Sequence, residues 1–167
     1  MRTALFLAAL ALLSGCGSKL KRLSSAETDH FNALKIFMNE SQEKSFLKQK
    51  TEDERNAYLK EIGMWDQFYK YDAEMREQIL SGEVMEGWSE DRVFMAWGNP
   101  VSRKRLTGRP ATRSELFVYR FEVDSEGYVR VWTPGSKTEY KARSTYQLNL
   151  YIDDSRVAEI VKKDKWE

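Results

Sequence analysis

The chain of 167 residues is long enough for one compact domain with additional segments. Apolar residues make up 41% and charged residues 32% of it, a composition that excludes an intrinsically disordered chain. The 27 Lys and Arg nearly balance the 26 Asp and Glu, which argues against a general nucleic-acid binder.

The N-terminus has the pattern of an export signal. Arg2 supplies a positive charge, and the apolar run from Ala4 to Leu13 is about half as long as a membrane-spanning helix needs to be. Residues 1–15 are therefore predicted to be a signal peptide. Its removal takes away one cation, Arg2, so the mature protein has 26 Lys and Arg, is formally neutral and carries no general attraction for anions.

The only cysteine, Cys16, follows directly after Leu13-Ser14-Gly15. This sequence resembles the bacterial lipobox, which implies cleavage before Cys16, a diacylglycerol on its thiol and a fatty acyl chain such as palmitate on its amine. Such chains hold a protein on a membrane without help from charge. Gly17 suggests the outer membrane, with residues 16–25 as lipidated cysteine and tether. An ordinary secretory signal that contains a cysteine is the alternative.

Residues 26–78 are predicted to form a helical region. Thr51 and Glu54 have the spacing of a capping box, and Gly63 is expected to kink a helix or to allow a close contact. Gly82 is expected to end a later helix. The apolar residues at helical spacing predict a common core, with a lipid or cofactor slot as the alternative. They include Phe31, Leu34, Phe37, Met38, Tyr58, Ile62, Trp65, Tyr69, Met75 and Ile79.

A short helix is predicted within residues 86–100. Ser89 is expected to cap its N-terminus, and Gly98 followed by Pro100 is expected to end it. A helix of about two turns is unstable alone and must dock on a flat partner. The face expected to dock carries Val93, Phe94 and Trp97.

Alternating apolar and polar residues after Pro100 predict strands. Residues 114–123 and 145–153 show the pattern most clearly, and residues 156–163 are expected to pair with the latter across a turn at Asp154-Ser155. Residues 102–108 predict a weaker first strand, and residues 124–144 an extended hairpin or a long loop. The predicted fold class is α+β, with N-terminal helices packed on a three- to four-stranded antiparallel sheet as a two-layer sandwich.

Several short motifs occur in a fixed order along the second half. They are Gly87-Trp88-Ser89, Val93, Trp97-Gly98-Asn99-Pro100, a strand with Tyr119, and LYIDDSRVAEI. Together they resemble the SmpA/OmlA (BamE-like) domain family of outer-membrane lipoproteins, over about Ile79 to Lys162. The resemblance implies an α+β domain at residues 79–167, in which Gly87, Trp88, Ser89, Trp97, Gly98 and Pro100 are structural motif residues.

The resemblance also carries an expectation about function. One known member of the family is an accessory subunit of the β-barrel assembly machinery, and the same layout resembles the repeat unit of β-lactamase inhibitor proteins, which bind other proteins. Two positions depart from the family pattern. Trp88 stands where Met is usual, and Ser155 stands where Gly is expected because the turn position requires a positive φ.

The sequence offers little for catalysis or cofactor binding. His30 is the single histidine and would have to serve any Ser-His-acid site, whereas a position on a helix surface or face is the simpler expectation. Histidine and cysteine are too few to bind a transition metal, and Asp153-Asp154 lacks the further ligands that Ca²⁺ needs. We expect no enzymatic activity, no cofactor, no metal and no nucleic-acid partner.

Five cations and no acid occur between Asn99 and Ser114. They are Arg103, Lys104, Arg105, Arg109 and Arg113. In a neutral protein this basic segment favours a contact with lipid headgroups or with an acidic partner, and a solvated hairpin is the alternative. Trp132 is expected to be either an exposed aromatic anchor or a core residue.

These features predict a lipid-anchored outer-membrane protein that faces the periplasm. The membrane is its partner through the acyl anchor, and an envelope protein is its expected second partner. The predicted role is that of a protein-binding scaffold or accessory factor in the assembly of outer-membrane proteins. A periplasmic inhibitor or ligand-binding module on the same fold is the main alternative, and an envelope enzyme is the third.

Overall fold

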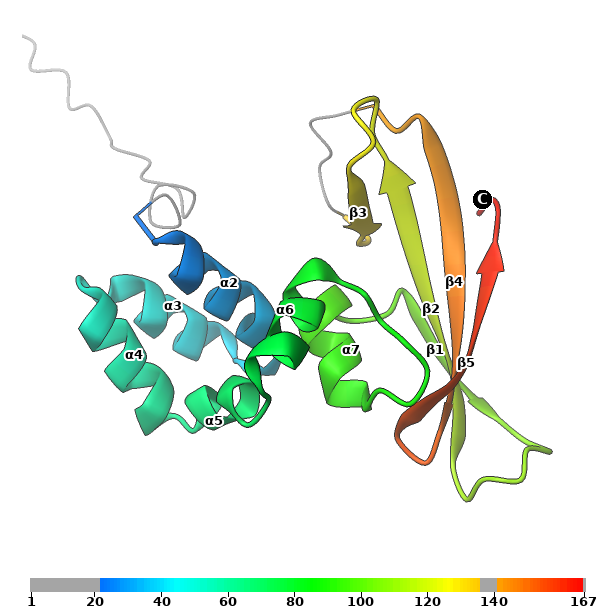
Figure 1. The fold of residues 1–167 in the computed structure, drawn as a ribbon, viewed down its shortest axis with the longest axis horizontal. Coiled ribbons are helices and arrows are strands. Elements are labelled where there is room, and N and C mark those ends of the chain that lie inside the picture. The colour runs from blue at the N-terminus through cyan, green and yellow to red at the C-terminus, as the bar shows by residue number, and fades with distance from the viewer. Residues whose placement is uncertain (1–21, 136–140, 167) are drawn as a thin grey trace, which may run out of the picture.

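The computed structural model describes residues 22–135 and 141–166, so Cys16, the signal peptide and residues 16–21 of the expected tether lie outside the described residues. A helical half comes first and an antiparallel sheet follows (Figure 1). The helices are α2 (Ser25–Leu34), η1 (Lys35–Phe37), α3 (Glu40–Lys48), α4 (Glu52–Glu61), α5 (Met64–Tyr69), α6 (Ala73–Ser81) and α7 (Glu90–Trp97). The strands are β1 (Ser102–Leu106), β2 (Ser114–Val123), β3 (Val129–Trp132), β4 (Ser144–Asp153) and β5 (Arg156–Lys163).

The helix starts follow from local sequence. Ser24, Asn39 and Thr51 each open a helix with a capping box, and Thr51 with Glu54 confirms the one predicted from the sequence. Gly63, at φ 71°, does more than kink its helix. It separates α4 from α5.

The break at Gly63 also changes which side chains face inward. Leu59 on α4 and Phe68 on α5 are 1% and 2% exposed, whereas the predicted stripe of Tyr58, Ile62, Trp65 and Tyr69 is only partly buried. The predicted packing of this stripe on a common core is confirmed, and its sequence neighbours Leu59 and Phe68 are more deeply buried because the helical phase restarts after Gly63. Gly82 ends α6 in the left-handed conformation, as predicted.

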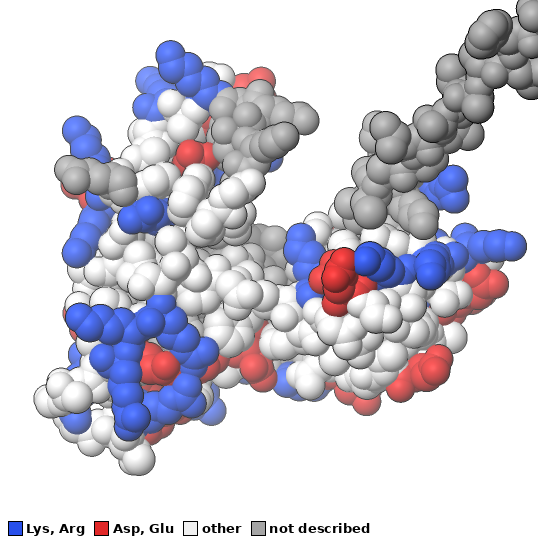
Figure 2. All heavy atoms as spheres, turned by 180° about the vertical axis from the view of Figure 1, so that it is seen from behind, with Lys and Arg blue, Asp and Glu red and all other residues white. Residues whose placement is uncertain are grey.

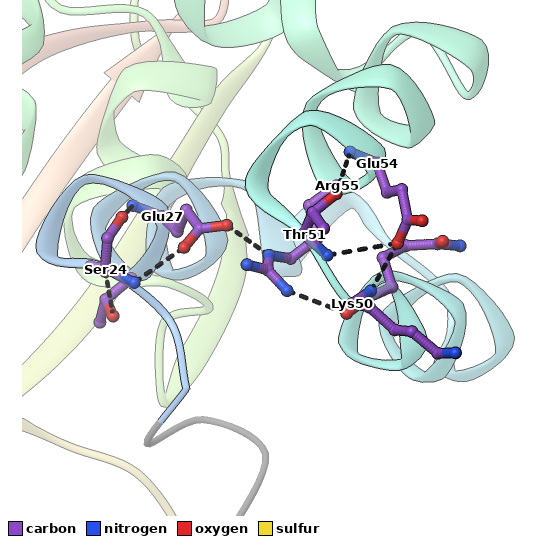
Figure 3. A network of polar contacts seen from close by, with 8 residues as sticks. Ser24, Glu27, Lys50, Thr51, Glu54 and Arg55 are labelled. Carbon is purple, nitrogen blue, oxygen red and sulfur yellow. Dashed lines mark hydrogen bonds and ion pairs between the residues drawn. The ribbon is translucent and has the colours of Figure 1, made fainter.

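A buried ion pair joins α2 to α4 (Figure 3). Arg55 Nε donates to Glu27 Oε1, and Arg55 Nη1 donates to the carbonyl of Gln49 at 2.9 Å. Glu27 Oε2 accepts from Ser24 N at 2.8 Å, so both carboxylate oxygens have partners. Burial raises the pKa of Glu27, but the hydrogen bonds from Arg55 and Ser24 outweigh it, and the pKa lies below its ordinary value.

The sheet has five strands, one more than the upper prediction. Its order is β1-β2-β4-β5, and β3 pairs with the C-terminal half of β2 on the edge whose N-terminal half pairs with β1. The additional strand β3 lies within the segment for which a hairpin or a long loop was predicted, and it pairs with β2 as a hairpin. The predicted pairs β2–β4 and β4–β5 are confirmed, and all pairs are antiparallel.

The apolar faces of the sheet and of α7 meet in one core. Phe117 and Tyr119 on β2 and Leu150 on β4 are fully buried, and Val93 on α7 is fully buried against them. In Figure 1, α7 stands between the sheet and the helices α2 to α5. The α+β fold is confirmed, with α7 as the helix that covers the sheet.

The helical half and the sheet are parts of one packing unit. The Trp97 ring contacts the rings of Tyr119 and Phe121 on β2, and its Nε1 donates to the carbonyl of Gly82 at 2.9 Å, just after α6. The expected boundary between residues 78 and 79 lies within α6. Within residues 22–135 and 141–166, no helix combines the length and the apolarity that a membrane span requires.

Candidate functional site

The motif Gly87-Trp88-Ser89 is paired with the start of β5. Gly87 N donates to the carbonyl of Val157 at 2.7 Å, and Val157 N donates to the carbonyl of Trp88 at 2.8 Å. The Trp88 side chain is 3% exposed. The motif thus extends one edge of the sheet by a short stretch of backbone pairing, a role that its sequence did not reveal.

Ser89 precedes α7 as predicted, but its hydroxyl accepts no capping hydrogen bond. Ser89 instead forms an isolated bridge with Arg156, and Glu90 N donates to the carbonyl of Ser155 at 3.1 Å. Ser89 is thus the N-cap residue that the sequence predicted, but only its backbone carbonyl accepts hydrogen bonds from the first turn of α7.

The end of α7 forms as predicted. Gly98 has φ 72° and its N–H donates to the carbonyl of Phe94 at 2.8 Å. The carbonyl of Gly98 accepts from the Tyr119 hydroxyl at 2.9 Å, which ties the helix end to β2. Pro100 follows, and β1 begins two residues later.

Arg103 of the basic segment is bound to acids from other elements. Its guanidinium donates twice to Glu115 on β2, at 2.8 Å each, and once to Glu90 on α7 at 3.3 Å. It also lies over the Phe117 ring, at 4.6 Å from the ring centroid. The bonds to Arg103 hold the pKa of Glu115 below its ordinary value, and Glu115 in turn raises the pKa of Arg103.

Arg109 and Arg113 are also paired. Arg109 forms a two-pronged ion pair with Asp153 on β4, through Nε at 3.0 Å and Nη2 at 2.7 Å. The hydrogen bond from Arg109, followed by that from Ser114, lowers the pKa of Asp153. Arg113 Nη2 lies 2.5 Å from Glu115. The basic segment contains no acidic residue of its own, but the fold places Glu115 and Asp153 from β2 and β4 next to its arginines.

Lys104 and Arg105 differ from the other three cations. Both are exposed, and neither has a side-chain ion pair or hydrogen bond within the part of the chain that the structure describes. The register of β1 with β2 places Arg105 opposite Glu115 on the face that carries Phe117, and Lys104 opposite Leu116 on the other face. Figure 2 shows Lys and Arg atoms gathered around enclosed acidic atoms at the lower left, where the β1–β2 hairpin ends.

A pocket of about 300 Å³ lies inside this hairpin. Its polar lining comes from Arg105, Thr107, Arg109, Thr112 and Ser114, and Gly108 turns the loop at φ 82°. None of its lining residues is acidic. The pocket is therefore suited to a small anionic group.

Trp132 lies on the opposite face of the sheet from α7. Its ring centroid is 5.1 Å from that of Trp166, and the Arg120 guanidinium lies over both rings at 5.6 and 4.8 Å. Trp132 is partly buried by this stack. It is thus neither an isolated exposed anchor nor a core residue, and it lies apart from Lys104 and Arg105.

His30 packs between helices rather than on the surface. Its Nε2 lies 2.5 Å from the Tyr69 hydroxyl, and its ring contacts Trp65 and Phe68 edge-on. Burial lowers the pKa of His30. The geometry joins α2 to α5. In residues 22–135 and 141–166, no group of three or more His, Cys, Asp or Glu side chains is placed to hold a metal ion.

No protein-family model, no curated protein and no solved structure matches this chain. The motif residues that carry the resemblance to the SmpA/OmlA family do lie together, since the Gly87-Trp88-Ser89 motif pairs with the LYIDDSRVAEI hairpin. Membership in that family remains a prediction.

Proposed function

We propose that this chain is a lipid-anchored protein of the outer membrane that faces the periplasm and binds another envelope protein, as a scaffold or accessory factor in outer-membrane protein assembly. The export signal and the lipobox around Cys16 support the anchor and the location. The motifs shared with the SmpA/OmlA family support the role in assembly.

One structural observation carries the protein-binding part of the proposal. Lys104 and Arg105 project from an edge strand at a pocket that Arg105 lines together with Arg109 and several hydroxyls. The charges of Lys104 and Arg105 have no internal partner in the described chain. Unpaired surface cations in a neutral protein raise the rate and specificity of binding to an acidic partner. The ion pairs of Arg103, Arg109 and Arg113 instead stabilise the hairpin on which Lys104 and Arg105 lie.

The test is crosslinking in intact cells, followed by purification of the full-length protein from detergent-solubilised outer membrane. Because Lys104 and Arg105 have no structural partner, the K104E/R105E variant should fold normally and lose its crosslinked partner. K48E/K50E is the matched control, since it changes two exposed cations at the end of α3 by the same charge. If K104E/R105E and K48E/K50E recover the same partner in equal amounts, Lys104 and Arg105 do not bind it and the proposal is wrong.

The anchor has a separate test. Metabolic labelling with palmitate should mark the wild-type protein and leave the Cys16→Ala variant unlabelled. A wild-type protein that is cleaved yet unlabelled would favour the ordinary secretory signal, and labelling of the variant would contradict acylation at Cys16.

A ligand-binding role is the second candidate, because of a groove between the helical half and the sheet. It has a volume of about 640 Å³ and lies between α2, α6, α7 and β3, with Ile36, Leu80, Trp97 and Val131 on its walls. Pockets of this size hold small molecules. Leu80→Arg would fill the rim of this groove and leave the crosslinked partner unchanged if the proposal above is correct.

A further inference from the structure

We propose that the β1–β2 hairpin recognises an extended acidic segment of its protein partner, which pairs with the free edge of β1 and places one carboxylate in the hairpin pocket. The inference rests on the proposed function and specifies the chemistry of the partner. Its two components are an anion pocket and an open strand edge, and each has its own evidence.

The pocket provides donors for one oxyanion. Asp153 binds the edge of the Arg109 guanidinium formed by Nε and Nη2, so Nη1 is left for a second acceptor. Asp153 also accepts from Ser114 Oγ at 2.6 Å, which fixes that side of the pocket. Arg105 has no partner in the described chain and contributes the uncompensated positive charge.

The charge balance of the pocket matches a single carboxylate. Asp153 neutralises Arg109, so the pocket keeps one net positive charge, that of Arg105. Guanidinium groups bind carboxylates through two parallel hydrogen bonds, a geometry stronger than a neutral hydrogen bond. The Thr107 and Thr112 hydroxyls line the same pocket and can donate to the remaining carboxylate lone pairs.

The edge of β1 determines the form of the partner. Among residues 22–135 and 141–166, no strand pairs with the outer edge of β1, so its backbone N–H and C=O groups there are open to pairing. Part of the opposite edge is occupied, because Trp88 and Ser89 pair with the start of β5. An extended peptide can pair with β1 and reach the pocket at its end, and this is the known binding mode of strand addition.

Charge complementarity makes that peptide acidic. Lys104 and Arg105 lie on opposite faces of β1, and both are exposed. A strand added at this edge would bring its own side chains next to them on the two faces, where acidic residues are favoured and basic residues are repelled. A free phosphate or a lipid headgroup would fill the pocket alone and leave the edge unpaired.

The probe is a synthetic peptide of about six residues, the length of an ordinary strand, in which two adjacent glutamates, one for each face of the strand, are flanked by valines. Binding to the full mature lipoprotein in neutral detergent is measured by fluorescence anisotropy. The proposal predicts that K104E/R105E and Arg105→Gln each weaken binding by about tenfold or more, and that K48E/K50E does not. Replacing the glutamates by glutamines should have the same effect as the K104E/R105E variant.

Two further experiments test the strand pairing and the chemical class of the ligand. N-methylation of alternate peptide amides should weaken binding by about tenfold, and equal binding of the methylated peptide would overturn strand addition. Inorganic phosphate, or anionic phospholipid vesicles, at the peptide concentration should not displace the peptide. Displacement by phosphate or by vesicles would show that the ligand is a phosphate group and not an acidic segment. If the peptide does not bind at all, the cations only protect an exposed strand edge from pairing.

These outcomes are distinct from failure of the proposed function. A partner recovered from cells that depends on Lys104 and Arg105, but without peptide binding, contradicts the strand-addition mode alone. Peptide binding without any partner in cells contradicts the proposed function.

Discussion

Replacing Arg55 by methionine removes the cation of the buried ion pair between α2 and α4, and we expect the folded protein to lose about 3–5 kcal/mol of stability. The expected loss of stability is large because both side chains are buried, with Glu27 3% and Arg55 6% exposed. The substitution leaves the Glu27 carboxylate buried with only the Ser24 backbone donor, and it also removes the donor to the carbonyl of Gln49. A buried charge without its partner bears the full cost of desolvation.

The double variant E27Q/R55M tests whether the loss of stability comes from the Glu27–Arg55 pair. Because it removes both charges together, its loss should be smaller than the sum of the two single losses by about 1–3 kcal/mol. The assay is equilibrium unfolding in urea, followed by circular dichroism. Lys44→Met is the control, since it breaks the exposed pair with Glu40 and should change stability little. A loss below about 1 kcal/mol for R55M, or additive losses, would refute the role of this pair.

Three further variants test other parts of the fold. Ser155→Gly should raise stability by about 0.5–1 kcal/mol in thermal unfolding, because Ser155 has φ 64° and glycine adopts that conformation without strain; a loss would contradict the assigned turn. Trp97→Phe should cost about 1–2 kcal/mol, since the carbonyl of Gly82 loses its donor, and unfolding should stay a single transition. Two separate transitions would show that the halves fold independently. The pKa of His30 is lower in the folded than in the unfolded protein because of burial, so its contribution to stability is complete above the unfolded value of 6.5 and is lost as the pH falls through it. Urea unfolding between pH 7 and pH 5 should show this loss, and His30→Gln should remove that part of the pH dependence.

Local features of the sequence predicted most of the fold. The capping box at Thr51, the helix ends at Gly82 and Gly98, and the alternation in β2 and β4 are each determined by residues a few positions apart. The break at Gly63 escaped prediction because a glycine within a helical pattern can either be tolerated or end the helix. For residues 124–144 the sequence left a hairpin and a long loop open, and the pairing of β3 with β2 confirms the hairpin.

The candidate site was harder to predict because it depends on contacts between distant residues. The five cations were found in the sequence, but the acidic partners of three of them, Glu90, Glu115 and Asp153, come from α7, β2 and β4. The predicted strands contained part of the signal, since pairing residues 102–108 with 114–123 in a hairpin brings Glu115 close to the arginines. Only the side-chain contacts of the structure distinguish the paired Arg103, Arg109 and Arg113 from Lys104 and Arg105.

The binding of an envelope protein by the exposed cations of β1 is best tested by crosslinking in cells, with K104E/R105E compared to K48E/K50E. We expect an envelope protein to be recovered with the wild type and with K48E/K50E, and to be lost with K104E/R105E while the variant stays folded and anchored. Recovery of the same protein with K104E/R105E, or of this chain alone from the wild type, would contradict it.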